Sequence, residues 1–128
     1  MAGYSGTPLP QKLGIKAGAR VRLSGAPEGF ARVIGVEPRS RGEADVLVLF
    51  SRSLAALERD FARLRKALHR DGGLWVAWPK KSSGVPTDLD ENAVRALGLA
   101  SGLVDNKVCA IDDTWSGLRF VVRLKDRG

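Results

Sequence analysis

The sequence predicts an α/β domain with three layers, in which helices cover both faces of a mostly parallel sheet and an antiparallel hairpin lies at the sheet edge. Apolar runs alternate with helical patterns along the chain. The run Asp45–Phe50 is continuously apolar and β-branched, as in strands covered on both faces. The last two strand-like segments are separated by a short turn. The 128 residues, 44% hydrophobic and 27% charged, suit a single soluble domain spanning residues 1–128.

The N-terminal part of the chain is predicted to be irregular and then to enter the sheet. Residues 1–18 are rich in Gly and Pro, so we expect a segment that packs on the domain with one helical turn over Leu9–Leu13. Arg20–Ser24 alternates as a strand does. It ends at Gly25-Ala26-Pro27, which predicts a turn and a short helix with Pro27 near its first position.

The middle of the chain reads as a strand–helix–strand unit. Ser53 is the predicted cap of a helix that ends at Asp71-Gly72-Gly73. The apolar positions of that helix recur at spacings of three and four: Leu54, Leu57, Phe61, Leu64 and Leu68. A second strand, Leu74–Trp78, closes at Pro79. We therefore expect Asp45–Phe50 and Leu74–Trp78 to lie side by side in the same direction, with the helix across them.

The last third predicts a helix followed by a hairpin. Thr87, with Asp90 three residues later, indicates a capping-box-like helix start. The apolar face of this helix carries Leu89, Ala93, Val94 and Leu97. Beyond it, Val104–Ile111 and Leu118–Leu124 are strand-like, and the linker Asp112–Gly117 is short enough for an antiparallel hairpin.

Composition excludes several classes of protein. The only cysteine, Cys109, cannot close an intramolecular disulfide or build a thiolate zinc site, and we expect no metal. The N-terminus has no signal-peptide pattern. The longest apolar run, Val46–Phe50, is far shorter than the roughly 20 residues of a membrane span, so no membrane is expected as a partner. These features indicate a cytoplasmic protein.

The order of the predicted elements resembles the C-terminal half of Rossmann-like methyltransferases. The string Leu68–Val76 is similar to their helix-to-strand passage, and the terminal hairpin to their antiparallel edge. Those enzymes carry a Gly-x-Gly-x-Gly turn after the first strand. The turn at this place, Ser24–Gly29, departs from that motif, and its Gly25 and Gly29 are the candidate cofactor contacts. Glu37 as the ribose acid would leave too few residues for a crossover. The resemblance implies a shortened, Rossmann-like methyltransferase fold without cofactor, with S-adenosylmethionine as the alternative.

A second resemblance covers nearly the whole chain. The strings Gly3–Leu9, Lys12–Lys16, Trp78–Leu89 and Val108–Leu118 resemble the domain-of-unknown-function 3052 family, a family of small bacterial proteins. This resemblance implies no catalytic residue. It indicates where the distinctive residues of such a protein lie.

The loop from Pro79 to Asp88 is the main candidate site. It leaves the carboxyl end of a strand and enters a helix N-terminus, where parallel sheets bind ligands and helix dipoles favour anions. Lys80 and Lys81 supply charge, and hydroxyl donors come from Ser82, Ser83 and Thr87. We expect two segments to join it: Tyr4 and Ser5, and the turn of Asp112, Asp113, Thr114 and Trp115. An ion pair from Lys80 or Lys81 to Asp112 is predicted if these loops meet, and a plain polar loop is the alternative.

The remaining candidates have simpler interpretations. His69 is expected to be a solvated surface residue, and Cys109 a small packed residue. Trp75 and Trp78 are expected in the core or in a pocket wall. The net charge of +7 permits attraction to nucleic acid. The basic stripe that would carry it, on the predicted first long helix, is Arg59, Arg63, Lys66 and Arg70. A solvated helix face is the first interpretation of this stripe, and a partner surface is the next.

The function expected from these features is a non-catalytic Rossmann-like binding domain for a small anionic ligand or a protein partner. No catalytic residue is expected. A reduced methyltransferase and a nucleic-acid-associated basic protein are the alternatives, and the oligomeric state is open because the terminal hairpin leaves an exposed edge.

Overall fold

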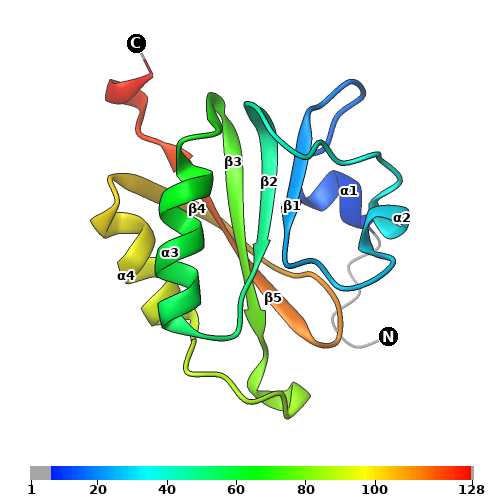
Figure 1. Cartoon of the computed structure of the whole chain (residues 1–128), viewed down its shortest axis with the longest axis vertical. Helices are drawn as coiled ribbons and strands as arrows, with labels where there is room; N and C mark the ends of the chain where they lie inside the picture. Colours follow the sequence, from blue (N-terminus) through cyan, green and yellow to red (C-terminus); the bar gives the residue numbers. More distant parts are fainter. Residues whose placement is uncertain (1–6, 128) are drawn as a thin grey trace.

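The computed structural model describes residues 7–127, which form a five-stranded sheet with helices on both sides (Figure 1). The strands are β1 (Val21–Ser24), β2 (Ala44–Phe50), β3 (Leu68–Pro79), β4 (Leu103–Ala110) and β5 (Trp115–Val122). Across the sheet their order is β1-β2-β3-β5-β4. β1, β2 and β3 run parallel, and β5 runs antiparallel to both β3 and β4.

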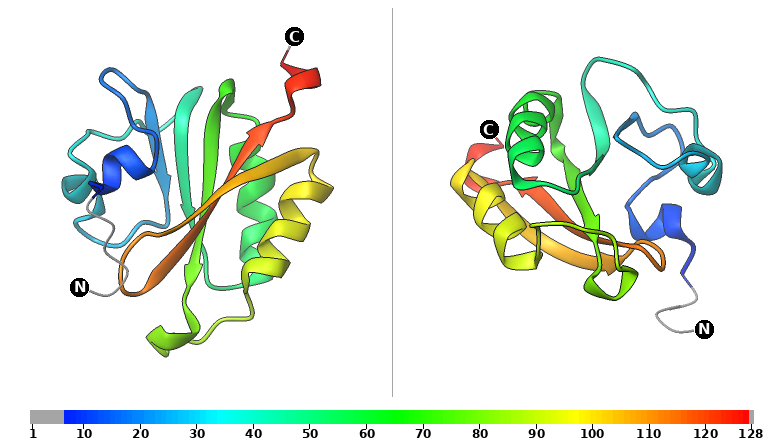
Figure 2. Two further views of the ribbon diagram at one scale, coloured as in Figure 1. Left: turned by 180° about the vertical axis from the view of Figure 1, so that it is seen from behind. Right: turned by 60° about the horizontal axis from the view of Figure 1, so that its bottom comes forward.

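Helices cover the two faces unequally. They are α1 (Leu9–Lys12), α2 (Phe30–Ile34), α3 (Leu54–Arg65) and α4 (Glu91–Ala100), with 3₁₀ turns η1 (Lys81–Ser83) and η2 (Leu124–Asp126). Figure 2 shows α3 and α4 together on one face of the sheet, while the short α1 and α2 lie on the other side beside β1. The expected helical turn over Leu9–Leu13 is confirmed as α1, with Leu13 as its C-cap.

The prediction of a three-layer, mostly parallel Rossmann-like sandwich, and with it of a shortened methyltransferase fold, is wrong. The sheet is mixed, because β5 enters between β3 and β4 and makes two of the four strand pairings antiparallel. The connections between the parallel strands also differ from a Rossmann-like fold. The chain goes from β1 to β2 to β3 in one direction across the sheet, and two right-handed connections would then lie on the same face. Here the β1–β2 connection packs Phe30 and Ile34 on one face, and α3 packs on the opposite face.

The central strand–helix–strand unit is confirmed. β2 and β3 pair in parallel from Val46 opposite Gly73 to Phe50 opposite Ala77, and α3 connects them. Ser53 caps α3 as predicted, because its hydroxyl accepts a hydrogen bond from the Ala56 amide at 3.2 Å.

The predicted end of this helix is wrong. α3 ends at Arg65, and Leu68 together with Asp71-Gly72-Gly73 belongs to β3. The glycines have a strand role. A Cβ on Gly72 would lie 3.1 Å from the Asp45 Cα of β2, and a Cβ on Gly73 would lie 2.7 Å from Cζ of Arg119 on β5. Both glycines therefore let neighbouring residues approach the β3 backbone closely. The sequence pattern alone does not distinguish glycines with this role from glycines that end a helix.

Two further helix starts differ from the prediction. α4 is capped by Asp90, whose carboxylate accepts from the Ala93 amide at 2.8 Å, and not by Thr87. α2 is capped by Gly29, so Pro27 lies before the helix, where its carbonyl accepts from the Phe30 amide at 3.1 Å. In both cases the observed helix start lies three residues after the predicted one.

The terminal hairpin is confirmed, although β5 begins earlier than expected. Trp115 and Ser116 already pair with Pro79 and Trp78 of β3. β4 forms the edge of the sheet, and Cys109 lies half-buried on it against the core.

Alternation along β2 and β3 divides the core between the two faces. Val46, Val48 and Phe50 face α1 and α2, and Leu47 and Leu49 face α3 and α4. This accounts for the continuous apolar run in the sequence. On β3, Trp75 faces α1 and Trp78 faces the opposite core, and both are buried as expected.

One buried hydrogen bond joins the N-terminal segment to the sheet. The indole Nε1 of Trp75 donates to the Leu13 carbonyl at 3.0 Å, and neither side chain is exposed. A buried carbonyl without a partner is costly, so this bond specifies how residues 7–18 lie on the sheet.

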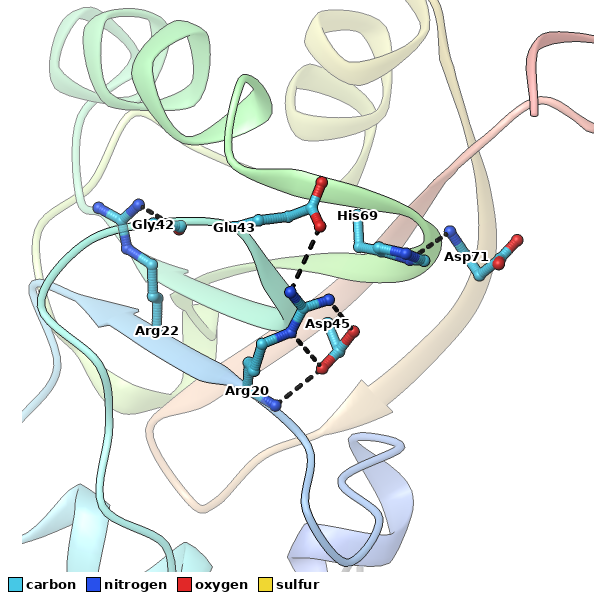
Figure 3. Close-up of polar contacts among 7 residues, drawn as sticks. All are labelled: Arg20, Arg22, Gly42, Glu43, Asp45, His69 and Asp71. Carbon is cyan, nitrogen blue, oxygen red and sulfur yellow. Dashed lines mark hydrogen bonds and ion pairs between the residues drawn. The ribbon is translucent and has the colours of Figure 1, made fainter. Parts of the chain in front are cut away.

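An ion-pair cluster fixes the amino ends of β1 and β2 (Figure 3). Asp45 accepts hydrogen bonds from the Arg20 backbone amide at 2.8 Å and from its guanidinium at 2.9 and 3.1 Å. Glu43 lies 3.4 Å from the same guanidinium. Hydrogen bonds from Arg20 lower the pKa of Asp45 from 3.8 to about 2. Nearby, His69 Nδ1 accepts from the Asp71 amide at 3.0 Å, and its side chain is half-buried on β3.

This pKa predicts a specific acid sensitivity. Because the carboxyl pKa is lower in the folded chain, Asp45 stabilises the fold above about pH 3.8, and that contribution is lost as the pH falls towards 2. Urea unfolding at pH 5, 3 and 2 should show a smaller loss of stability in Asp45→Asn than in the wild type over this interval. Asp113→Asn removes an exposed turn carboxylate and retains Asp45, so it should follow the wild type. Equal acid sensitivity of Asp45→Asn and wild type would contradict this assignment.

Candidate functional site

A pocket of about 630 Å³ lies at the carboxyl ends of β1 and β2. Its lining comes from residues after β1, the end of β2, the β2–α3 connection and the first two turns of α3. The loop before α4 and the first residue of β5 each add one residue. The lining residues are Gly25, Pro27, Phe50, Ser51, Arg52, Ser53, Ala56, Asp60, Val85 and Trp115. This is the edge at which open α/β sheets hold ligands.

The walls of the pocket form because β1 and β2 end close together. Gly25 has φ of 66°, and a Cβ there would lie 2.8 Å from the Phe50 carbonyl oxygen. Glycine therefore permits both the left-handed turn and the contact with β2.

Aromatic rings form one side of the pocket. The ring of Phe50 contacts Trp115 edge-on at 5.0 Å between centroids and Phe30 at 4.9 Å. Phe50 is almost fully buried, whereas Trp115 is half-buried and lines the cavity. The result is a fixed apolar wall, suited to the flat or apolar part of a ligand.

Arg52 lies at the polar end of the pocket. The Arg52 side chain is exposed, and it forms no ion pair within residues 7–127. The Arg52 carbonyl accepts a 2.7 Å hydrogen bond from the Thr87 hydroxyl, which fixes the backbone at this position. Asp60, the carboxylate in the lining, lies 3.4 Å from Arg59 and 3.6 Å from Arg63.

The α3 N-terminus beside Arg52 is largely satisfied by the chain itself. The Asp88 carboxylate accepts from the Leu54 amide at 2.8 Å, and Ser53 accepts from the Ala56 amide. An anion in this pocket would therefore depend on the Arg52 guanidinium, with the helix end as a minor contribution.

The predicted lysines face a different hollow. Lys80 and Lys81 line a pocket of about 370 Å³ together with Trp78 and the α4 residues Asp90 to Asn92. The carboxylates of Asp90 and Glu91 share this lining, so its charge is mixed. Ser83 donates to the Lys80 carbonyl at 2.6 Å, and Ser82 is exposed in the same turn. The Pro79–Asp88 loop thus divides its residues between two pockets, with Val85 in the first and the lysines in the second.

The Asp112 turn is used structurally. The Asp112 carboxylate accepts from the amides of Thr114 and Trp115, both at 2.8 Å, which is an Asx turn. The loops do meet, because the Lys80 amide donates to the Thr114 carbonyl at 2.8 Å. Within residues 7–127, however, neither Lys80 nor Lys81 forms an ion pair with Asp112. Asp113 is exposed, and Trp115 is the residue of this turn that reaches the main pocket.

Tyr4 and Ser5 lie outside the described residues. Of the two glycine candidates, Gly25 lines the main pocket and Gly29 lines a smaller one beside α2. The residues that sequence reasoning missed are Phe50, Ser51 and Arg52. Only their position in the sequence could have indicated a site. They stand at the carboxyl end of the strongest predicted strand and directly before the predicted helix cap.

The basic stripe predicted on one helix does not exist as such. Arg59 and Arg63 lie on α3 with Asp60 between them, but Lys66 is the C-cap and Arg70 is on β3. The stripe depended on a helix extended to residue 70, so the wrong helix end also removes the predicted surface.

Among residues 7–127, no three His, Cys, Asp or Glu side chains are grouped so that they could hold a metal ion. No described helix has the length and apolar character needed to cross a membrane. No protein-family model matches the chain, and a search of curated proteins finds no match.

Proposed function

We propose that this chain is a binding domain that takes a small anionic ligand with an aromatic or apolar part in the pocket at the carboxyl ends of β1 and β2. The observation that carries the proposal is the composition of that pocket. A fixed aromatic wall, Phe50 and Trp115, lies in the same cavity as Arg52, which is exposed and forms no ion pair with any residue from 7 to 127.

Size and chemistry support a ligand of this class. A cavity of about 630 Å³ is within the roughly 300–1,000 Å³ range of small-molecule pockets. Arginine presents a planar donor fork that matches a carboxylate or phosphate, and the aromatic rings offer an apolar surface beside it. A cytoplasmic location is part of the proposal and rests on composition, since the chain has one cysteine.

The proposal is tested by thermal-shift screening of the full chain with carboxylates, phosphates and nucleotides. 2-Naphthoate is the reference probe, because it combines a flat ring system with one carboxylate. We expect it to stabilise the protein, and we expect Arg52→Gln to weaken its binding about tenfold in calorimetry, as for loss of a charge-assisted hydrogen bond. Arg41→Gln, which removes an exposed arginine that is outside the lining and makes no contact with it, should change the affinity less than about twofold.

The screen also decides between the rival functions. Absence of stabilisation by every anion, or equal effects of Arg52→Gln and Arg41→Gln, would overturn the proposal. S-adenosylmethionine is included, and selective binding of it would favour the reduced methyltransferase instead. A protein partner on this edge would be indicated if Arg52→Gln abolished capture of one identified protein while no small anion bound.

A further inference from the structure

The pocket at the carboxyl ends of β1 and β2 contains a carboxylate as well as a guanidinium. Among residues 7–127, the charged residues in its lining are Arg52 and Asp60. A ligand with only a negative group would balance the charge of Arg52 and offer nothing to Asp60. Complementary charges on the two sides of an interface give specificity, so this lining favours a ligand that carries a positive group as well.

The geometry of α3 directs Asp60 into the pocket. Ser53, Ala56 and Asp60 follow one another at spacings of three and four residues, which places them on one face of the helix, and all three line the pocket. Two helical turns, or about 10 Å along the helix axis, separate the backbone of Ser53 from that of Asp60. The backbone of Arg52, directly before Ser53, is therefore well separated from that of Asp60.

The two charged residues are also fixed by different elements. The Arg52 carbonyl accepts a hydrogen bond from Thr87, in the loop before α4. Asp60 is linked instead to the end of β1, because Arg63 Nη2 lies 3.6 Å from Asp60 Oδ1 and donates to the Ser24 hydroxyl at 3.3 Å. The two charges are therefore held at separate points of the lining. A ligand that reaches both carries its polar groups at separate positions of its ring system.

Asp60 has one carboxylate oxygen without a hydrogen bond from the protein. Its contacts with Arg59 Nε, at 3.4 Å, and with Arg63 Nη2 both involve Oδ1, and no donor within residues 7–127 bonds to Oδ2. The side chains of Arg59 and Arg63 are 75% and 53% exposed, so these ion pairs are weak. Asp60 itself is only 23% exposed. Its second oxygen is thus suited to accept from an ammonium group.

We propose that the ligand of this pocket is an aromatic zwitterion, with its carboxylate on Arg52 and an amine on Asp60. This inference rests on the function proposed above and adds the second polar group of the ligand. The ring system would lie against Phe50 and Trp115. A doubly charged phosphate is disfavoured, because the carboxylates of Asp60, in the lining, and of Asp88, at the α3 N-terminus, would repel it.

Calorimetry of the full chain with two matched probes tests this inference. One probe is 2-naphthoate, and the other is 6-(aminomethyl)-2-naphthoate, which adds an ammonium across the ring system from the carboxylate. We expect the wild type to bind the second probe about tenfold more tightly, as for one added charge-assisted hydrogen bond. Asp60→Asn should reduce this gain to less than about twofold. Glu58→Gln removes an exposed carboxylate of α3 that is outside the lining, and it should retain the gain.

A third probe makes the test independent of the folding of Asp60→Asn. 6-(Hydroxymethyl)-2-naphthoate has a similar size to the amine but no positive charge, so the wild type should bind it within about twofold of 2-naphthoate. Equal affinities of the wild type for the amine and the alcohol would overturn the inference.

The remaining outcomes separate this inference from the proposed function. If 2-naphthoate binds in a manner that depends on Arg52 and the amine adds nothing, the inference is wrong and the proposed function stands. Equal losses of the gain in Asp60→Asn and Glu58→Gln would also overturn the inference alone. If the wild type binds none of the three probes, both are overturned.

Discussion

Trp75→Ala is expected to lower the free energy of unfolding by about 3–5 kcal/mol, the range for removal of a large buried aromatic side chain. Trp75 is fully buried in the centre of β3, and its loss leaves a cavity between the sheet and the N-terminal segment. It also removes the donor to the Leu13 carbonyl. Urea unfolding followed by far-ultraviolet circular dichroism measures the change.

Two variants separate packing from hydrogen bonding at this position. Trp75→Phe retains most of the apolar contact and removes the indole N–H, so the part due to the Leu13 carbonyl should appear as about 1–3 kcal/mol. Val33→Ala, at a side chain that is 62% exposed, should change stability by less than about 0.5 kcal/mol. If Trp75→Ala were as mild as Val33→Ala, the assignment of Trp75 to the core would be contradicted.

Gly98→Ala is expected to destabilise the protein by about 1–3 kcal/mol through overpacking, although alanine is the better helix former by about 1 kcal/mol. Gly98 lies inside α4, and a Cβ there would meet the ring of Phe120, with Cδ1 at 2.5 Å. Both the helix backbone and the ring on β5 are buried, so neither moves freely. Thermal or urea unfolding gives the sign directly.

A double-mutant cycle tests the cause of this effect. Phe120→Leu removes the ring atoms that a Cβ at position 98 would meet, so the cost of Gly98→Ala should be smaller in that background. Stabilisation by Gly98→Ala in the wild-type chain would show that helix propensity outweighs the contact and that α4 lies farther from β5.

The parts of the fold that could be predicted from sequence are those set by local patterns. The apolar run of β2, the three-and-four spacing of α3 and the hydroxyl of Ser53 each identify an element from neighbouring residues alone. The direct connection between β2 and β3 through one helix then restricts them to a parallel pair.

The parts that could not be predicted depend on contacts between distant residues. Nothing in the sequence of β5 shows that it pairs with β3 as well as β4. Its position between these two strands makes the sheet mixed and changes the fold class. Gly72 and Gly73 have the composition of a helix end. In the structure, glycine is needed at these positions because Asp45 and Arg119 pack against their backbone, and those residues lie 27 and 46 positions away along the chain.

The described pocket differs from the predicted site in its place as well as in its residues. The sequence predicted a site around the Pro79–Asp88 loop, where β3 ends. The pocket described above lies at the carboxyl ends of β1 and β2, and Gly25 and Trp115 are the predicted residues in its lining. The lysines were favoured for their charge, yet the loop that carries them turns towards α4. Arg52 was overlooked because it stands between a strand and a helix cap without any motif around it.

Amide chemical-shift mapping by NMR during a titration with 2-naphthoate tests the proposed pocket most directly. We expect the largest perturbations on the lining residues Gly25, Ser51, Arg52 and Trp115, and we expect them to saturate together. Perturbations centred instead on the Lys80 and Lys81 turn, or spread over basic residues without saturation, would contradict the proposed pocket.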